Sequence, residues 1–324
     1  MKKLLASSCA TLLSGCSMVV LDPAGHIAVQ EARLLVISTL LMLLIIVPVI
    51  VLTLLFAWRY RAGNTDAPYE PEWDHSIQLE LVIWSAPLLI IIALGAITWI
   101  STHTLNPYRP LDANVAAPKV EPIDVQVVAL DWKWLFIYPK LGIATVNELA
   151  APVDVPVRFS ITSASVMNSF YIPALAGQIY AMPTMETKLH AVINQPGEYR
   201  GISANYSGAG FSDMHFQFHG MSAADFDSWV QKAKASGQAL GRDVYLQLAR
   251  PSAPEPPRMF ATVAPGLFDA VVNQCVAPGT QCLHAVMAAD ELRASAAAGW
   301  RPDSQICSAA DAATFASLPL PQRK

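Results

Sequence analysis

Charged residues are scarce in this sequence. Only 14% of the 324 residues are Asp, Glu, Lys or Arg, whereas 53% are hydrophobic, and this balance indicates membrane segments rather than a soluble protein. The net charge is −4, so there is no excess of positive charge with which to bind nucleic acid. Cysteine is also scarce, with five residues and no Cys-x-x-Cys-His motif, so covalent haem attachment has no support.

The amino terminus is predicted to be an export signal covering residues 1–15. Met1-Lys2-Lys3 supplies positive charge, and a mostly apolar run follows from Leu4 to Leu13. The next residues, Leu13-Ser14-Gly15-Cys16, resemble the lipobox of bacterial lipoproteins. This resemblance implies cleavage before Cys16 and attachment of lipid, palmitate included, to the mature chain. Residues 16–33 are then a lipidated periplasmic N-terminus.

Two charge-free runs, 34–58 and 81–101, are predicted to be transmembrane helices. Each reaches the ~20 residues that a bilayer-crossing helix needs. Neither run shows the polar stripe that a surface helix of a soluble protein would carry. Because a lipidated Cys16 is processed on the outer face, the first helix runs inward, residues 59–80 form a cytoplasmic loop, and the second helix returns outward. Two such spans would keep the protein in the bacterial inner (plasma) membrane.

Glu80 stands at the cytoplasmic start of the second run. A carboxylate in the first turn of a helix is favoured by the helix dipole, so this position alone is explained by a structural role. A functional role rests on the family resemblance described below.

The carboxy-terminal part is predicted to be periplasmic and mainly β. Residues 102–122 form a proline-containing linker. Runs with apolar residues at alternate positions follow, around Val125, Phe159 and Phe216, and turns rich in Pro and Gly separate them. This pattern predicts an antiparallel sandwich over residues 123–250. His215 and His219 do not predict a metal site, because residues four apart in a strand are separated by about 13 Å.

Residues after the sandwich are predicted to form a short helical extension and a tail, 251–324. Ahead of them, Ser222 begins a helix as a variant of the capping box, with Gly237 as a plausible end. One face of this helix is apolar and comprises Phe226, Trp229, Val230 and Ala233. In an oxidising periplasm two of the last three cysteines are expected to pair, and the short turn between them favours Cys275 with Cys282.

The stretch from Ser163 to Met214 resembles the cupredoxin domain of subunit 2 of haem-copper respiratory oxidases. Its second half includes Ser203-Ala204-Asn205-Tyr206-Ser207. In the copper-bearing members of that family, a histidine stands at the position of Asn168 and cysteines stand at Ser203 and Ser207. The glutamate of the family corresponds to Asn205, its second histidine to Phe211, and its methionine to Met214, which alone is retained.

A dinuclear copper centre needs soft thiolate bridges and imidazoles, which hydroxyl groups and a phenyl ring do not replace. The resemblance is therefore to the quinol-oxidising branch, subunit 2 of cytochrome o (bo-type) ubiquinol oxidases, whose cupredoxin-like Greek-key domain carries no copper. The segment around Trp132 and Trp134 resembles the one through which copper-bearing relatives receive electrons from cytochrome c. Without copper, we expect both rings to pack against the membrane-embedded partner. Residues 257–269 resemble an aromatic tail motif of quinol-oxidase subunit 2, which extends the likeness over roughly Leu13 to Val272.

The resemblance implies a terminal oxidase that pumps protons, oxidises ubiquinol and reduces oxygen to water. Subunit 1 would hold the haems and copper, so this chain is expected to bind no cofactor or metal and to contribute no catalytic residue. Its partners would be subunits 1, 3 and 4 and membrane lipids, but not cytochrome c, and its role would be structural, with Glu80 at the mouth of a proton pathway. Two alternatives are a cytochrome c oxidase subunit, which the missing cysteines oppose, and a periplasm-facing lipoprotein that binds a ligand and has no part in electron transfer.

Overall fold

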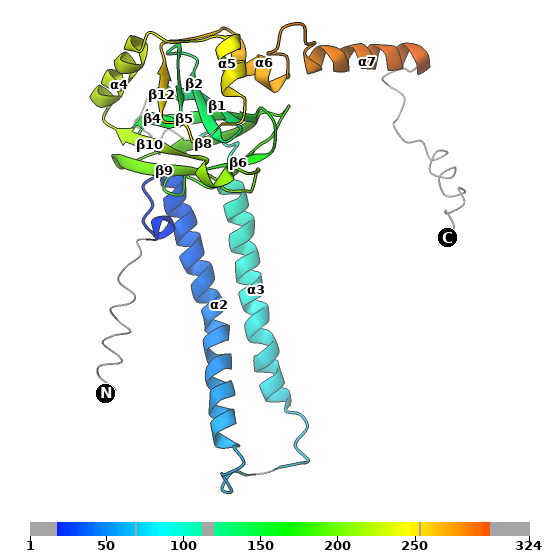
Figure 1. Cartoon of the computed structure of the whole chain (residues 1–324). Coiled ribbons are helices and arrows are strands. Elements are labelled where there is room, and N and C mark those ends of the chain that lie inside the picture. Colours follow the sequence, from blue (N-terminus) through cyan, green and yellow to red (C-terminus); the bar gives the residue numbers. More distant parts are fainter. Residues whose placement is uncertain (1–17, 69, 112–119, 253, 299–324) are drawn as a thin grey trace.

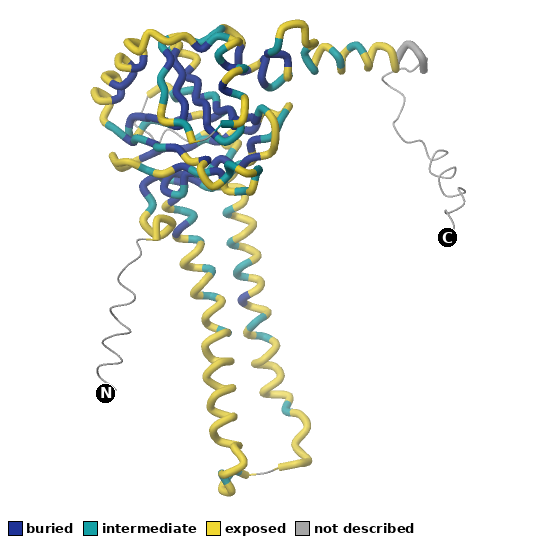
Figure 2. The backbone as a smooth tube through the Cα atoms, viewed as in Figure 1, coloured by how far each residue is buried: buried dark blue, intermediate teal, exposed yellow. Residues whose placement is uncertain are grey.

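A β-sandwich lies at one end of two long helices (Figure 1). The computed structural model describes residues 18–68, 70–111, 120–252 and 254–298. The two helices are α2 (His26–Arg59) and α3 (Ile77–Thr104), and both are long and apolar enough to cross a membrane. Their side chains are exposed along most of their length (Figure 2), as expected of surfaces that face lipid or a partner subunit. The lipobox and Cys16 lie outside the described residues.

Helix α2 begins at His26, earlier than the predicted span at residue 34. The additional turns pack against the sandwich, since Ile27, Ala28 and Ala32 are buried at that end of the helix. Helix α3 likewise extends beyond its predicted span at both ends. Hydropathy detects only the apolar part of a helix, so it missed these more polar ends.

The sandwich has a six-stranded sheet in the order β12-β3-β2-β1-β5-β8 and a five-stranded sheet in the order β4-β10-β9-β6-β7. The strands of the first sheet are β1 (Ile123–Leu130), β2 (Lys133–Tyr138), β3 (Ile143–Val146), β5 (Pro156–Ser163), β8 (Thr187–Val192) and β12 (Arg258–Phe260). Those of the second are β4 (Glu148–Pro152), β6 (Asn168–Tyr171), β7 (Ile179–Ala181), β9 (Gly197–Ser203) and β10 (His215–Met221). The predicted two-sheet sandwich is thus confirmed.

The prediction of purely antiparallel sheets was wrong for two strand pairs. Strand β1 pairs parallel with β5, and β10 pairs parallel with β4. Parallel neighbours require a crossover, and here the chain passes from one sheet to the other between them. Residue alternation reports which side of a strand is buried and not the direction of its neighbour, so the sequence did not distinguish these pairs.

The core between the sheets is rich in aromatic rings. Trp134 is fully buried and makes edge contacts with Phe170 and Phe216, at ring-centroid distances of 5.4 and 5.8 Å. Phe170 and Phe216 stack on one another, 5.4 Å apart. Such pairs add stability beyond that of their buried area. The predicted alternation accounts for this core, since Val125, Phe159 and Phe216 all point into it.

A second core covers the opposite face of the six-stranded sheet. It contains Val128 and Leu130 of β1 together with residues of the carboxy-terminal segment. This segment consists of β11 (Ala239–Leu240), α5 (Arg242–Leu248), β13 (Thr262–Val263) and α6 (Leu267–Val272). Because both faces of β1 are covered, the sequence from Val127 to Leu130 has no polar alternate positions.

The boundary predicted at residue 250 does not separate two packing units. Strand β12 pairs with β3 and forms the edge of the six-stranded sheet. The side chain of Lys133 also ties this region together, since its ammonium group donates hydrogen bonds to the carbonyls of Leu248 (2.9 Å) and Arg250 (3.0 Å) while being 1% exposed. Strand β12 is too short to show an alternating pattern, which is why the sequence placed it in a tail.

The helix predicted after Ser222 is α4 (Ala223–Ala235). The Ser222 hydroxyl accepts a hydrogen bond from the Asp225 N–H, as a capping residue should. All four predicted apolar positions are buried, and Gly237 follows the helix with a left-handed φ of 69°. Beyond it, a disulfide joins Cys275 to Cys282, and helix α7 (Leu283–Ala298) then extends away from the sandwich (Figure 1).

Candidate functional site

The positions that correspond to copper ligands come together at one end of the sandwich, between β6 and β9. Asn168 begins β6 and Ser203 ends β9, and both side chains are buried, at 1% and 4% exposure. The Ser203 hydroxyl donates a hydrogen bond to the Asn168 Oδ1 (3.1 Å), and the Asn168 amide donates to the Val166 carbonyl (3.1 Å). The Asn168 and Ser203 side chains thereby make the hydrogen bonds that buried polar groups need, without a metal.

The loop after β9 is fastened to β6 by a second set of hydrogen bonds. The Ser169 hydroxyl donates to the Asn205 Oδ1 at 2.7 Å, and the Ala204 N–H donates to the Ser169 carbonyl at 3.0 Å. The Asn205 amide donates in turn to the Met167 carbonyl at 3.3 Å. The Asn205 side chain therefore joins the loop after β9 to β6 and the residue before it by hydrogen bonds.

The remaining positions lie between β9 and β10. Ser207 is in the loop, Phe211 begins a short helical turn, η2 (Phe211–Asp213), and Met214 follows that turn directly before β10. Met214 is buried, its N–H donates to the Phe211 carbonyl, and its carbonyl accepts from the Ser203 N–H, each at 3.1 Å. The Phe211 ring is half-buried and makes an edge contact with Tyr206. The Ser207 hydroxyl is buried and has no hydrogen-bonding partner within the described chain.

The donors offered here are hydroxyls, carboxamides and one thioether. Among the described residues, no group of three or more His, Cys, Asp or Glu side chains gathers in a way that could hold a metal ion. This set lacks the thiolates and imidazoles that a dinuclear copper centre requires. What the arrangement does provide is two hydrogen-bonded loops with a fixed shape, one leading into β6 at Asn168 and the other running from Ser203 to Met214. We call them the loop pair.

Trp132, in the turn before β2, and Trp134, within β2, do not share the role that was expected of both. Trp134 belongs to the core between the sheets, so it cannot pack against a partner subunit, and that prediction was wrong for this residue. Trp132 is half-buried and lies over Gly208 and Gly210 of the loop. A Cβ atom at Gly210 would lie 2.3 Å from the Trp132 ring, so glycine is required there for the ring to cover the loop.

Glu80 lies in the first turn of α3, and this end of the helix points away from the sandwich that holds the loop pair (Figure 1). Its N–H donates to the Ser76 carbonyl at 2.9 Å. The carboxylate is exposed in the isolated chain. Nothing in the described chain contacts it as a partner would, so its surroundings are set by what packs against this end of the helices.

A junction between α2 and the sandwich was missed from the sequence. The N–H groups of Ala24 and Gly25 both donate to the Ala174 carbonyl, at 3.0 and 2.8 Å, and the Asn194 N–H donates to the Ala24 carbonyl at 2.9 Å. A Cβ at Gly25 would lie 2.5 Å from the Leu175 carbonyl oxygen, so only glycine allows this approach. Segments of small residues carry no periodic signal, and Ala24 and Gly25 gave no hint of this role.

Comparison with known proteins identifies the family. Residues 141–220, which include all the positions above from Asn168 to Met214, match the family described as cytochrome c oxidase subunit II, periplasmic domain. Residues 234–279 match the COX aromatic rich motif, as the tail resemblance predicted. The chain is 52% identical over 272 residues to cytochrome bo(3) ubiquinol oxidase subunit 2 of Pseudomonas aeruginosa, covering 84% of this chain and 81% of that one. This chain belongs to the subunit 2 family of bo3-type ubiquinol oxidases.

Other relatives agree with this assignment. Ubiquinol oxidase subunit 2 of Acetobacter aceti is 51% identical over 265 residues, covering 82% of this chain and 85% of that one. Among solved structures, the periplasmic domain of subunit II of cytochrome oxidase of Bradyrhizobium japonicum is 23% identical, with a TM-score of 0.35, and covers 36% of this chain and 96% of that one. That TM-score is too low to support an assignment, so the family rests on the sequence matches. The chain is thus a respiratory membrane protein with two apolar helices and a periplasmic domain, and it works as one subunit of a larger complex.

Proposed function

We propose that this chain is the copper-free, lipid-anchored subunit 2 of a proton-translocating ubiquinol oxidase in a bacterial inner membrane. The observation that carries the proposal is the donor set of the loop pair, in which Ser203 and Asn168 satisfy one another by a hydrogen bond. Ubiquinol delivers electrons from within the membrane, so a copper relay to a soluble donor is unnecessary. The subunit covers the outer face of subunit 1, which holds the haems and copper and carries out the chemistry, and subunits 3 and 4 complete the complex. A ligand-binding lipoprotein unrelated to electron transfer does not fit membership of this family.

The arrangement in the membrane follows from this proposal. Residues 1–15 are removed, Cys16 is lipidated on the outer face, and the segments 34–58 and 81–101 of α2 and α3 lie in the hydrocarbon. The loop 59–80 faces the cytoplasm.

The test of the function is the native complex purified through this chain. Its visible spectrum should show haem, and oxygen uptake should be supported by ubiquinol and not by reduced cytochrome c. Copper analysis of the full-length chain separated from subunit 1 should find none. A chain that purifies alone, or one that brings copper with it after separation, would contradict the proposal.

Replacing Glu80 with alanine is expected to slow oxygen reduction roughly tenfold, which corresponds to about 1.4 kcal/mol in the barrier. The reason is that a carboxylate at the inner end of α3 collects protons for subunit 1 and has no packing role that the described chain reveals. The measurement is turnover per haem. Glu72→Ala, which removes an exposed carboxylate from the same loop, is the matched control and should leave turnover unchanged. Normal turnover of an assembled Glu80→Ala complex would assign this residue to a helix-end role.

The mature chain is expected to begin at Cys16 and to carry diacylglycerol on its sulfur. Intact-mass analysis checks this, and an uncleaved Met1 or an unmodified Cys16 would refute it. The Cys16→Ser variant should still be found in the membrane, because two apolar spans bind a bilayer far more strongly than acyl chains do.

A further inference from the structure

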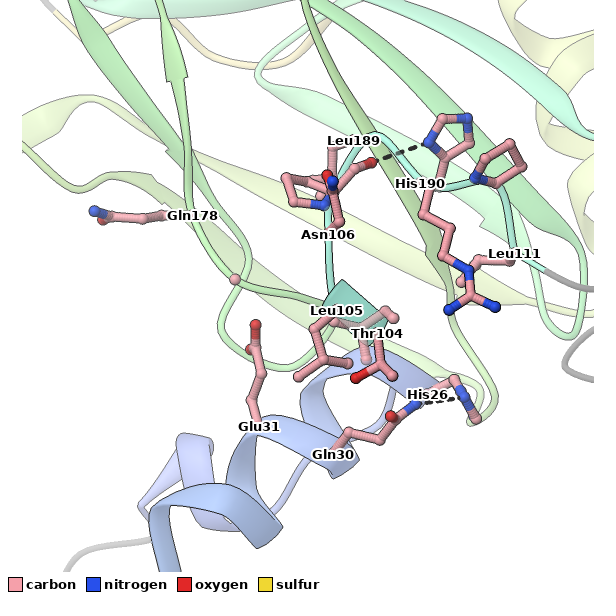
Figure 3. A pocket seen from close by; sticks show the side chains of 15 residues that line it. His26, Gln30, Glu31, Thr104, Leu105, Asn106, Leu111, Gln178, Leu189 and His190 are labelled. Atoms are coloured by element: carbon pink, nitrogen blue, oxygen red, sulfur yellow. Dashed lines mark hydrogen bonds between the residues drawn. The ribbon is translucent and has the colours of Figure 1, made fainter. Parts of the chain in front are cut away.

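A cavity of about 250 Å³ lies where both helices meet the sandwich (Figure 3). Its floor is formed by the outer end of α2, with His26, Gln30 and Glu31, and by Thr104 at the end of α3. Its upper wall comes from the sandwich and from the segment after α3, and it includes His190 and Arg109. None of these residues belongs to the loop pair or to the proton pathway.

The depth of the cavity can be placed relative to the bilayer. Glu31 precedes the charge-free span 34–58 by three residues, and Thr104 follows the span 81–101 by three. At ~1.5 Å per helical residue, both lie roughly 5 Å outside the hydrocarbon. The headgroup region on each side of a bilayer is about 5–7 Å thick. The cavity therefore opens at the level of the outer-leaflet headgroups, given the orientation proposed above.

The Glu31 carboxylate is held in place on one side of the cavity. It is half-buried and accepts a hydrogen bond from the Gly177 N–H. A Cβ at residue 177 would lie 2.5 Å from a carboxylate oxygen of Glu31, so glycine leaves the room that this side chain occupies. Figure 3 shows Glu31 rising from α2 toward the sandwich. One hydrogen bond leaves a carboxylate with unused acceptor positions, which suit an ammonium group.

A group of the opposite charge stands across the cavity from Glu31. His190 lies on that far side (Figure 3), and its Nδ1 donates to the Pro107 carbonyl at 3.0 Å, so its Nε2 is an acceptor and offers phosphate no proton. The group that suits phosphate is the Arg109 guanidinium, which is always charged and also lines the cavity. One wall thus suits a cation and the other an anion.

We propose that this cavity binds the headgroup of a phospholipid that carries a primary ammonium group, as phosphatidylethanolamine does. The ammonium group donates to Glu31 and the phosphate lies toward Arg109. A choline headgroup has no N–H donor for Glu31, and a free phosphate ion would be repelled by that carboxylate. The lipid joins α2, α3 and the sandwich at the membrane surface.

The test uses the whole native complex exchanged into nanodiscs that contain equal amounts of ethanolamine, choline and glycerol phospholipids with identical acyl chains. Native mass spectrometry then counts the lipids that stay bound. The complex should retain one tightly bound ethanolamine lipid that the Glu31→Gln variant loses, with its occupancy falling about tenfold, equivalent to ~1.4 kcal/mol. Glutamine keeps an oxygen for the Gly177 N–H, so the fold and assembly should be unaffected. Glu186→Gln, an exposed carboxylate outside the cavity, is the matched control.

Three outcomes would overturn the proposal: equal retention of choline lipid, an unchanged count in Glu31→Gln, or displacement of the bound molecule by millimolar inorganic phosphate, which would identify a simple anion site. A structure of the complex with a subunit 1 side chain in the cavity would overturn it as well. Quinol-dependent oxygen uptake is measured on the same samples. Loss of lipid selectivity in an active complex rejects the lipid site alone, whereas a complex without quinol oxidase activity rejects the proposed function.

Discussion

A full-length chain with five substitutions in the loop pair should bind two copper ions and absorb intensely in the visible. The changes are Asn168→His, Ser203→Cys, Asn205→Glu, Ser207→Cys and Phe211→His, with Met214 retained. They place two thiolates, two imidazoles and a thioether on loops whose backbone is already fixed by hydrogen bonds. Soft sulfur ligands select copper, and thiolate coordination gives strong absorption. Copper per chain and the visible spectrum are measured on protein separated from subunit 1.

The structure changes which of these substitutions is the most difficult. Phe211 is only half-buried, so replacing its ring leaves little cavity. Asn168 is 1% exposed, and the larger imidazole must be accommodated in a packed site, which costs about 1–3 kcal/mol. Ser207→Cys should cost little stability, because the buried Ser207 hydroxyl makes no hydrogen bond in the described chain that the substitution would remove.

A triple variant with Asn168→His, Asn205→Glu and Phe211→His is the matched control. It contains both imidazoles but neither thiolate, and it should not show the intense absorption. A folded and fully reduced quintuple variant that stays colourless and free of copper would show that the residue correspondences with the copper-bearing relatives are incorrect.

Replacing Lys133 with methionine should lower the free energy of unfolding by roughly 3 kcal/mol. The ammonium group donates to two carbonyls at the end of α5, and each such charge-assisted bond contributes about 1.5–3 kcal/mol. Carbonyls at a helix end have no partner within the helix, so methionine, which fills the space, leaves them unsatisfied. The measurement is denaturant unfolding of the full-length chain in detergent, followed by tryptophan fluorescence.

Lys140→Met is the matched control on the same β-hairpin. Lys140 is exposed and lies 3.4 Å from both Glu121 and Asp124, and surface pairs of this kind contribute about 0–1 kcal/mol. If the two variants unfold alike, the buried hydrogen bonds of Lys133 do not hold the carboxy-terminal segment on the sheet.

The pH dependence of unfolding gives a separate check on Lys133. Burial lowers the pKa of this ammonium group, opposed by the nearby carboxylate of Glu255. The unfolded chain therefore binds this proton more tightly than the folded chain. The free energy of unfolding should rise with pH between the pKa in the folded state and the ordinary lysine value. Lys133→Met should lack that rise, and a rise of equal size in both proteins would contradict the assignment.

The sequence predicted those elements whose signals are local. The alternating strands, the cap at Ser222 and the aromatic tail motif each depend on residues close together in the chain, and all were found. The site positions came from the family resemblance, because no spacing rule identifies Ser203 or Asn205 as former ligands. The elements that were missed depend on distant partners: the parallel pairing of β1 with β5, the attachment of β12 to β3, and the burial of Trp134.

The junction at Ala24 and Gly25 places a constraint on the order of biogenesis. These residues are synthesised before either membrane span, yet their hydrogen-bonding partners, Ala174 and Asn194, are synthesised after both spans and most of the sandwich. The core of the sandwich cannot be completed until the chain through Asn194 has been exported to the side of the membrane on which Ala24 lies. The domain can therefore be completed only in a chain whose two spans are both inserted correctly. If one span is misinserted, the two halves of this contact lie on opposite sides of the membrane.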